Sequence, residues 1–265
     1  MLITSRSNPA VVAAAALHDK KYRDEQHLFL FEGIKLFREA VLSGIDIVSV
    51  FTSEKNLPFC REMLPGKDII QVSDSVIEKL STEKSPQGVI CVAKYIDKIH
   101  NLNKIYTMKD FISRDRRIMI LSSLRDPGNL GTVIRTASAF GTDELILSAD
   151  CADIYNPKTV RAAMGTLFRQ RITYAANLRD AVIMMKKAGY NVCAAVLDRE
   201  SERLDKMKIT SKTAFVIGNE GHGISPDIIE AAGSKVYIPM EDGVESLNAA
   251  AAAAVFMWQM KISVL

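Results

Sequence analysis

Apolar and polar residues alternate in short blocks along the first third of the chain. Residues 34–44 place apolar side chains at helical spacing and end on a glycine, which predicts a helix. Residues 75–81 predict a second helix, with Ser73 or Asp74 as its N-cap. Four apolar runs between these segments predict β-strands, at residues 27–33, 46–53, 67–74 and 88–96. Residues 1–97 are therefore expected to form a small α/β domain.

The alternation resumes after a polar interruption. Residues 98–116 show no clear period, and we place a linker there. Strands are expected at 117–124, 143–150, 190–197, 213–218 and 234–240. Helices are expected between and after them, at 128–141, 179–189 and 247–261, and Ser246 would cap the last one. Such alternation predicts a second α/β domain over 117–265, with a mostly parallel sheet covered on both faces.

Composition narrows the class of protein. The 265 residues are 48% hydrophobic and 25% charged, which is typical of a globular protein with a sizeable core. A net charge of +3 excludes a strongly basic nucleic-acid binder but leaves room for a local basic patch. The four cysteines form no C-x-x-C pair, so neither a zinc site nor a disulfide framework is expected. The chain shows no secretory signal and no bilayer-spanning stretch, and we expect a cytoplasmic protein.

Arg135 stands out on the helix expected at 128–141. Its neighbours at helical spacing are the small residues Gly131, Thr132, Ser138 and Ala139, which leave open space around the guanidinium. A contact with a substrate needs such space, although a solvated surface arginine fits the same pattern. Asn129 precedes this arginine by six residues and is a candidate N-cap.

Residues 156–179 form the most cationic stretch of the chain. They contain five basic residues and no acid, and aromatic residues lie among them. Cations interleaved with aromatics suit contacts with RNA phosphates and bases. Acids brought close by the fold would instead make the stretch an ordinary solvated face. The candidates for RNA binding are Lys158, Arg161 and Arg169.

Two loops follow apolar runs and carry small or polar residues. The first is G-N-E-G-H-G at 218–223, and the second follows I-P-M at 238–240. Ligands of open α/β sheets bind beyond the carboxyl ends of the strands, and glycines there permit close approach of the backbone. Each loop taken alone is also compatible with a simple surface turn.

Four motifs in this order resemble the SpoU (TrmH-like) family of RNA ribose 2′-O-methyltransferases, in the SPOUT superfamily. They are N-x-x-x-x-x-R at 129–135, N-P-K-x-x-R-A at 156–162, G-N-E-G-x-G at 218–223, and I-P-M with E-S-L-N at 238–248. The resemblance implies a parallel sheet whose C-terminal part is threaded into a trefoil knot. Residues 1–97 also resemble the family's substrate-binding domain, through H-L-F-L-F-E-G at 27–33 and S-P-Q-G-V at 85–89, and that domain resembles ribosomal RNA-binding proteins of α/β fold. This second resemblance implies that residues 1–97 select the RNA.

The resemblance further implies an S-adenosylmethionine site. Gly218, Ile238 and Leu247 would contact the cofactor mainly through backbone groups. Gly221, Met240 and Ser246 would line the same pocket. No metal is expected, because the methyl group of a sulfonium is already activated.

The catalytic set implied by the resemblance centres on Arg135. This arginine would bind an RNA phosphate and orient the 2′-hydroxyl, or act as the base. The residues expected to hold it and line the site are Asn129, Glu220, Ser246 and Asn248. In the family the site forms at a dimer interface, so a homodimer is expected.

Three functions remain open at this point. The first is 2′-O-methylation of rRNA, which the resemblance of the N-terminal domain favours. The second is methylation of a tRNA ribose. The third is a non-catalytic RNA-binding protein that retains the cofactor pocket.

Overall fold

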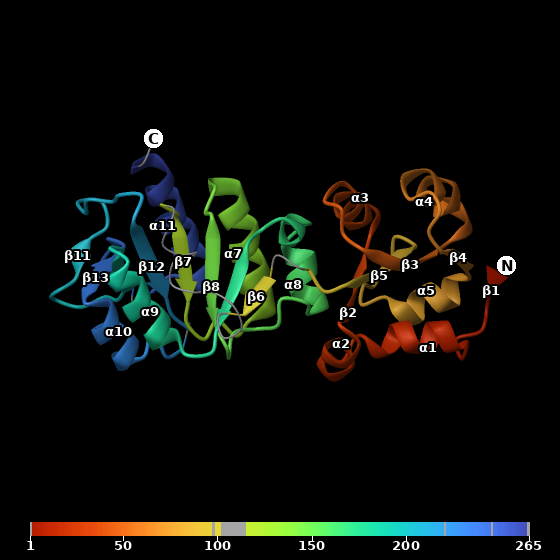
Figure 1. Ribbon diagram of the computed structural model, residues 1–265, viewed down its shortest axis with the longest axis horizontal. Coiled ribbons are helices and arrows are strands. Elements are labelled where there is room, and N and C mark those ends of the chain that lie inside the picture. The colour runs from red at the N-terminus through yellow and green to blue at the C-terminus, as the bar shows by residue number, and fades with distance from the viewer. Residues whose placement is uncertain (1, 97–98, 102–114, 220, 245, 264–265) are drawn as a thin grey trace. The chain divides into compact units, whose positions relative to one another are not determined.

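The computed structural model describes residues 2–96, 99–101, 115–219, 221–244 and 246–263. Its contacts divide the chain into two compact units (Figure 1). Unit 1 comprises Met1–Asp97 and Asp153–Arg169, and unit 2 comprises Lys98–Ala152 and Gln170–Leu265. The segment 153–169 therefore packs with the N-terminal residues, although the predicted domain boundaries assign it to the C-terminal domain.

Unit 1 contains one mixed sheet in the order β1-β4-β3-β5-β2. Strand β5 is antiparallel to both of its neighbours, and the other pairs are parallel. The strands are β1 (Leu2–Ile3), β2 (Leu28–Glu32), β3 (Ile47–Thr52), β4 (Ile69–Val72) and β5 (Val89–Lys94). The helices are α1 (Pro9–Ala16), α2 (Lys20–Gln26), α3 (Ile34–Leu42), α4 (Leu57–Met63), α5 (Asp74–Leu80) and α8 (Pro157–Ala162), with short 3₁₀ turns at Glu54–Asn56 and Thr166–Phe168.

The predicted strands of unit 1 and its helices α3 and α5 are confirmed. Ser73 is the N-cap of α5, although its side chain makes no capping hydrogen bond. Helices α1, α2 and α4 were not predicted. Val11 of α1 and Ile77 of α5 cover one face of the sheet and pack against buried Leu30 and Phe51.

Contacts of 153–169 with the N-terminal residues explain why this segment belongs to unit 1. The rings of Tyr155 and Phe29 lie with their centroids 4.7 Å apart. Arg23 is only 2% exposed and pairs with Asp153, with Nη2 2.6 Å from Oδ2. Removing one member of a buried ion pair leaves an uncompensated charge, so this pair holds the segment firmly in place.

Unit 2 contains an eight-stranded sheet in the order β11-β13-β10-β12-β7-β8-β9-β6, and every pair in it is parallel. The strands are β6 (Ile99–Asn101), β7 (Ile118–Leu121), β8 (Glu144–Ser148), β9 (Ile172–Ala175), β10 (Asn191–Ala195), β11 (Glu202–Arg203), β12 (Thr213–Ile217) and β13 (Ser234–Tyr237). The helices are α7 (Pro127–Phe140), α9 (Leu178–Lys187), α10 (Pro226–Ala232) and α11 (Ala249–Ser263). The predicted parallel sheet is confirmed.

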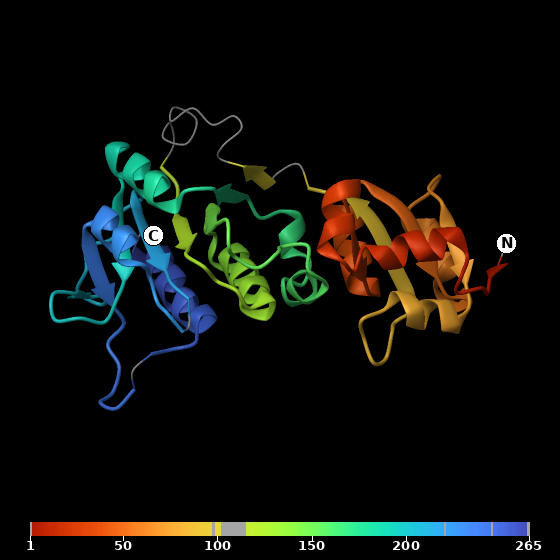
Figure 2. The same cartoon turned by 90° about the horizontal axis from the view of Figure 1, so that it is seen from below.

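Helices cover both faces of this sheet, as predicted. Figure 2 shows α7 and α11 on one side and α9 and α10 on the other. Alternate residues of β12 face the two layers: Val216 joins the core under α9 and α10. Phe215 packs instead against Phe256 of α11, with ring centroids 4.7 Å apart. Helix α11 also packs along α7, which brings two distant motifs of the sequence together.

Some predicted details of unit 2 are wrong. Residues 99–101 form strand β6 beside β9 rather than part of a linker, and residues 102–114 lie outside the described part of the chain. The side chain of Asp126, not Asn129, caps α7. The side chain of Asn248, not Ser246, accepts from the amide of Ala250 and caps α11. In both cases a second polar residue near the helix start is the better-placed acceptor.

Candidate active site

Three neighbouring strands of unit 2 end at one cavity. Strands β13, β10 and β12 are adjacent in the sheet, and the residues that follow them surround a volume of about 210 Å³. Helix α11 forms a further wall through Ala249, Ala252 and Phe256. This is the carboxyl edge of a parallel sheet, where ligands of such folds bind.

Five of the six predicted cofactor residues line this cavity. They are Gly218, Ile238, Met240, Ser246 and Leu247. Gly221 is not in the lining. Within the described residues, no hydrogen bond is made by the backbone groups of Gly218, Ile238 or Leu247. These groups are therefore available to a ligand, as the resemblance implies.

Asn219 organises the loop after β12, a role that the sequence analysis missed. Its Nδ2 donates to the carbonyl of Ser123 at 2.9 Å, which fastens the loop to the end of β7. Its Oδ1 accepts from the amides of Gly221 and His222 at 2.8 and 3.2 Å. Asn219 also pairs through its backbone with Gly223. An asparagine before small residues is a known turn signal, and it was present in the motif.

Gly218 is required by the path of the chain itself. A Cβ at this position would lie 2.3 Å from the carbonyl carbon of Gly223 and 2.7 Å from the amide nitrogen of Ile224. Backbone atoms cannot yield to such a contact, so no other residue fits here without moving the loop. At Gly221 an added Cβ would meet only Asn219 Oδ1, at 3.4 Å. Backbone packing therefore requires glycine at position 218, whereas it leaves room for a Cβ at position 221.

The predicted catalytic residues are brought together only in part. Asn248 Nδ2 donates to Asn129 Oδ1 at 3.2 Å, so the starts of α7 and α11 meet beside the cavity. Arg135 is exposed on α7, and among the described residues it has no hydrogen-bond or ion-pair partner. It is not among the residues that line the cavity. Glu220 lies outside the described residues.

The turn after β7 is fixed by a small polar cluster. The amide of Ser123 donates to Ser148 Oγ at 2.8 Å. Burial acts to raise the pKa of Asp150, but hydrogen bonds from Ser148, Ser123 and Arg125 outweigh it and hold this pKa below its ordinary value. Asp150 therefore stays ionised and keeps Ser123 in the position from which its carbonyl binds Asn219.

Two arginines of the cationic segment are paired with acids. Arg169 Nη1 lies 2.7 Å from Glu39 Oε2, and Arg161 forms an ion pair with Glu83. Both acids come from the N-terminal part of unit 1, which supports the interpretation of these arginines as a compensated face. Lys158 lies in the first turn of α8, where its amide binds the Asn156 cap.

Neither a metal site nor a membrane span is found among the described residues. No group of three or more histidine, cysteine, aspartate or glutamate side chains is arranged there to hold a metal ion. In the same part of the chain, no helix is both long and apolar enough to cross a bilayer.

Comparison with known proteins gives the two halves separate matches. Residues 8–91 match the MRM3-like substrate binding domain. The RlmP 23S rRNA (guanosine(2553)-2′-O)-methyltransferase of Bacillus subtilis is 29% identical over 98% of each chain. The structure of an AdoMet-bound rRNA methyltransferase from Sinorhizobium meliloti is 29% identical, with a TM-score of 0.86 over 100% of this chain and 98% of that one.

A structure described as the TrmH/SpoU tRNA modifying enzyme of A. aeolicus is less similar. It is 24% identical, with a TM-score of 0.50 over 59% of this chain and 83% of that one, and it shows a shared fold only. The SpoU rRNA Methylase family model matches residues 116–258, which include the cavity, the two asparagines that meet beside it, and Arg135. The chain belongs to the SpoU rRNA Methylase family.

Proposed function

We propose that this protein transfers a methyl group from S-adenosylmethionine to a ribose 2′-hydroxyl of rRNA. The observation that carries the proposal is the cavity at the ends of β10, β12 and β13. Its lining combines apolar side chains with backbone groups that have no partner among the described residues. Membership of the SpoU rRNA Methylase family supports the reaction.

The cavity suits a small ligand with an apolar ring and polar edges. Leu197, Ile238 and Leu247 offer apolar surface, and free backbone groups at Gly218 and Ile238 offer hydrogen bonds. Such a lining is typical of small-molecule sites. When bound, S-adenosylmethionine supplies an activated methyl group. Gly218, Ile238, Met240, Ser246 and Leu247 would hold it, and Gly221 would shape the loop beside it.

Arg135 is assigned to the RNA rather than to the cofactor. A planar guanidinium binds a phosphate in a fixed orientation, which would fix the neighbouring 2′-hydroxyl for in-line attack. A guanidinium with a pKa above about 12 is a poor base, so orientation is its main task. Asn129, Asn248, Ser246 and Glu220 complete the proposed site, and the Asn129–Asn248 hydrogen bond keeps the two helix starts in register.

A homodimer would complete this site. Arg135 is not among the lining residues of the cavity of its own chain, and the family resemblance implies that the site forms at a dimer interface. Helix α11 exposes the apolar side chains of Val255, Trp258 and Ile262, which follow one another at helical spacing. An exposed apolar stripe of this kind marks an association surface. We assign it to the second copy of the chain.

The trefoil knot is proposed for the C-terminal part of unit 2. In support, the chain leaves β13 on the far side of β10 and returns to pack α11 against α7 and β12. The chain therefore crosses back over its own strands in the region where the family is knotted.

Ribosomal RNA is favoured over tRNA by the extent of the similarity. The rRNA-methylating relative from B. subtilis matches 98% of this chain, so the match includes unit 1, whereas the tRNA modifying enzyme covers 59%. Lys158, Arg161 and Arg169 remain candidates for phosphate contacts, and the ion pairs of the two arginines reduce their expected contribution. We also propose a cytoplasmic location, which the similarity to the rRNA-methylating relative from B. subtilis supports.

The test is methyl transfer from labelled S-adenosylmethionine to large-subunit rRNA of the source organism, with tRNA in parallel and a chelator present. We expect the label in rRNA. Because a methylated 2′-hydroxyl cannot attack the adjoining phosphodiester, the labelled nucleotide should be protected from alkaline cleavage at that bond. Labelling of tRNA alone would move the assignment to tRNA. Binding of both rRNA and S-adenosylmethionine without methyl transfer, even to undermodified rRNA, would favour the non-catalytic alternative.

A further inference from the structure

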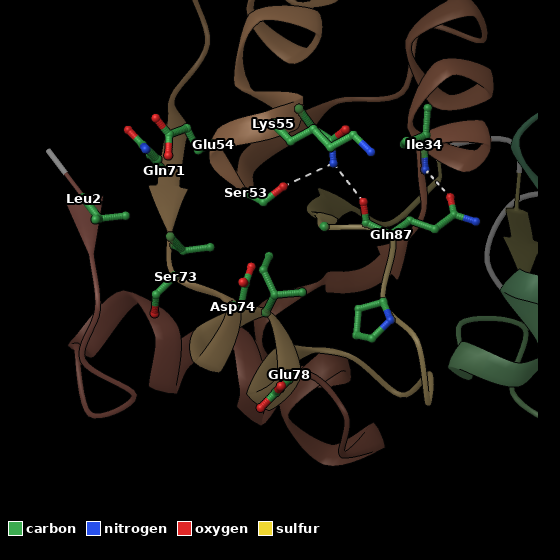
Figure 3. A pocket seen from close by; sticks show the side chains of 15 residues that line it. Leu2, Ile34, Ser53, Glu54, Lys55, Gln71, Ser73, Asp74, Glu78 and Gln87 are labelled. Atoms are coloured by element: carbon green, nitrogen blue, oxygen red, sulfur yellow. Dashed lines mark hydrogen bonds between the residues drawn. The ribbon is translucent and has the colours of Figure 1, made fainter.

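Unit 1 carries two adjoining hollows that the proposed chemistry does not use. The first, the polar hollow, has a volume of about 1140 Å³ and lies at the ends of β3 and β4 (Figure 3). The second, the basic hollow, has a volume of about 670 Å³ and lies along α3. Ile34 and Gln87 line both, so these two residues form the ridge between them.

Acidic and amide side chains line the polar hollow together with apolar ones such as Leu2, Val72 and Ile77. Glu54, Asp74, Glu78 and Gln71 line it, and Lys55 is the cation in its described lining. Among the described residues, none of these five side chains has a hydrogen-bond or ion-pair partner. Three carboxylates against one ammonium would repel a phosphate. The hollow is therefore suited to a group that donates hydrogen bonds.

The ridge is fixed independently of those acids. Gln87 Oε1 accepts from the amide of Ile34 at 3.0 Å, and Asn56 Nδ2 donates to the Gln87 carbonyl at 2.8 Å (Figure 3). Asn56 is only 8% exposed. The wall between the hollows is thus built by buried and backbone-bound amides, and the carboxylates remain available to a partner.

The basic hollow has the opposite charge. Lys35 and Arg38 line it and are exposed, and neither has a partner among the described residues. Its acid, Glu39, is already paired with Arg169. Apolar surface from Leu42 and Phe59 lies beside the two cations. Positive charge next to aromatic and aliphatic surface suits the backbone of a single strand of nucleic acid.

We propose that an unpaired RNA segment crosses the Ile34–Gln87 ridge, with its phosphates on Lys35 and Arg38 and a base in the polar hollow. There the carboxylates of Glu54 and Asp74 accept hydrogen bonds from amino or imino groups of the base, as acids do from cytosine. Recognition of RNA sequence generally uses unpaired bases in this way. The inference rests on the proposed function, because it assigns a sequence-selecting site to the substrate domain of the same enzyme.

The decisive measurement is RNA affinity after removal of negative charge from the polar hollow. The probe is the fragment of large-subunit rRNA transcript that the wild-type protein methylates. Glu54→Gln with Asp74→Asn is expected to weaken binding about tenfold, since each lost base contact costs discrimination. Removing two negative charges would otherwise strengthen the binding of a polyanion. Equal or tighter binding overturns the proposal, and equal binding leaves the hollow to another partner, such as a basic peptide.

The proposed phosphate contacts of Lys35 and Arg38 are tested by the salt dependence of RNA binding. Lys35→Gln and Arg38→Gln are each expected to lower the slope of log affinity against log salt by about one unit, whereas the acid variants leave this slope unchanged. The matched control is Glu62→Gln, an exposed acid on α4 outside both hollows, which should bind RNA at least as well as wild type. Unchanged slopes for both cationic variants overturn the assignment of the phosphates.

Two further readouts separate the possible failures. S-adenosylmethionine affinity belongs to unit 2 and should be equal in all variants, and the thermal unfolding transition of each variant verifies that unit 1 is folded. If the wild-type protein labels no RNA, the proposed function fails. If it labels RNA while the acid variants bind as tightly as wild type, only the present inference fails.

Discussion

The cavity of unit 2 and the polar hollow of unit 1 occupy equivalent places and differ in nearly everything else. Both lie beyond the carboxyl ends of parallel strands, after β10, β12 and β13 in one case and after β3 and β4 in the other. The first holds about 210 Å³ between apolar side chains and backbone, and the second about 1140 Å³ between acidic, polar and apolar side chains. The cavity of unit 2 thus fits a small ligand, whereas the polar hollow of unit 1 fits a portion of a macromolecule.

The difference lies in how each rim is built. In unit 2 the rim is formed by closely packed backbone segments. The backbone of Gly218 lies against that of Gly223, and the side chain of Asn219 donates a hydrogen bond to the carbonyl of Ser123. Its shape is therefore fixed before a ligand arrives. In unit 1 the ridge at Gln87 is fixed by hydrogen bonds, whereas the side chains of Glu54, Asp74 and Glu78 have no partner among the described residues. A rim of backbone selects by shape, whereas a rim of side chains selects by charge and hydrogen bonding.

The largest expected effect is on methyl transfer, and it follows from replacing Arg135 in unit 2. Arg135→Ala should lower methyl transfer in single turnovers by about 100- to 1000-fold, because the phosphate is no longer oriented. Arg135→Lys should fail similarly, since a point charge does not reproduce a planar fork. S-adenosylmethionine affinity should not change. Arg179→Ala, at another exposed arginine of unit 2, is the control, and equal activity of the two alanine variants would contradict the assignment.

A smaller effect is expected from the rim of the cavity. Gly218→Ala places a Cβ against the backbone of Gly223, and we expect S-adenosylmethionine affinity to fall by about tenfold or more. Gly221→Ala meets only a side-chain oxygen at 3.4 Å and should stay within about threefold of wild type. Calorimetric titration measures both. Similar losses in the two variants would mean that the rim is not fixed by chain packing.

The smallest effect is expected from the cationic segment of unit 1. Arg161→Gln and Arg169→Gln remove cations that are already paired with Glu83 and Glu39. We therefore expect each to weaken rRNA binding by less than about threefold and to change the salt slope by less than one unit. Binding at several salt concentrations measures this. A full unit of slope lost per arginine would show that RNA displaces these acids.

Much of the candidate site was accessible from the sequence because its residues lie within short motifs. Gly218, Ile238, Met240, Ser246 and Leu247 were assigned to one pocket from two loops, and all five line the cavity. The parallel sheet of unit 2 followed from strands that alternate with helices, a pattern that antiparallel hairpins do not produce. Local spacing predicted the sheet, and the resemblance of the motifs to those of the SpoU family implied the pocket residues.

The N-caps of α7 and α11 could not be predicted from the local sequence. At both α7 and α11 two polar residues competed for the cap, and the sequence analysis chose the wrong one each time. Asn129 and Asn248 instead meet across the two helices at 3.2 Å. Which of two nearby polar side chains turns to its own backbone depends on what packs opposite it, and the sequence does not contain that information.

The sequence by itself determined the alternation of elements and the parallel sheet, since these depend on local spacing, and its resemblance to the SpoU family implied the residues of the cavity. Only the tertiary structure decided which side chains are neutralised. Residues 156–179 contain no acid, yet Glu39 and Glu83 reach two of their arginines. Tertiary structure also decided that 153–169 belongs to unit 1, through Arg23 and Asp153, which lie 130 residues apart in the chain. Charge compensation depends on distance in space, and a linear pattern does not encode that distance.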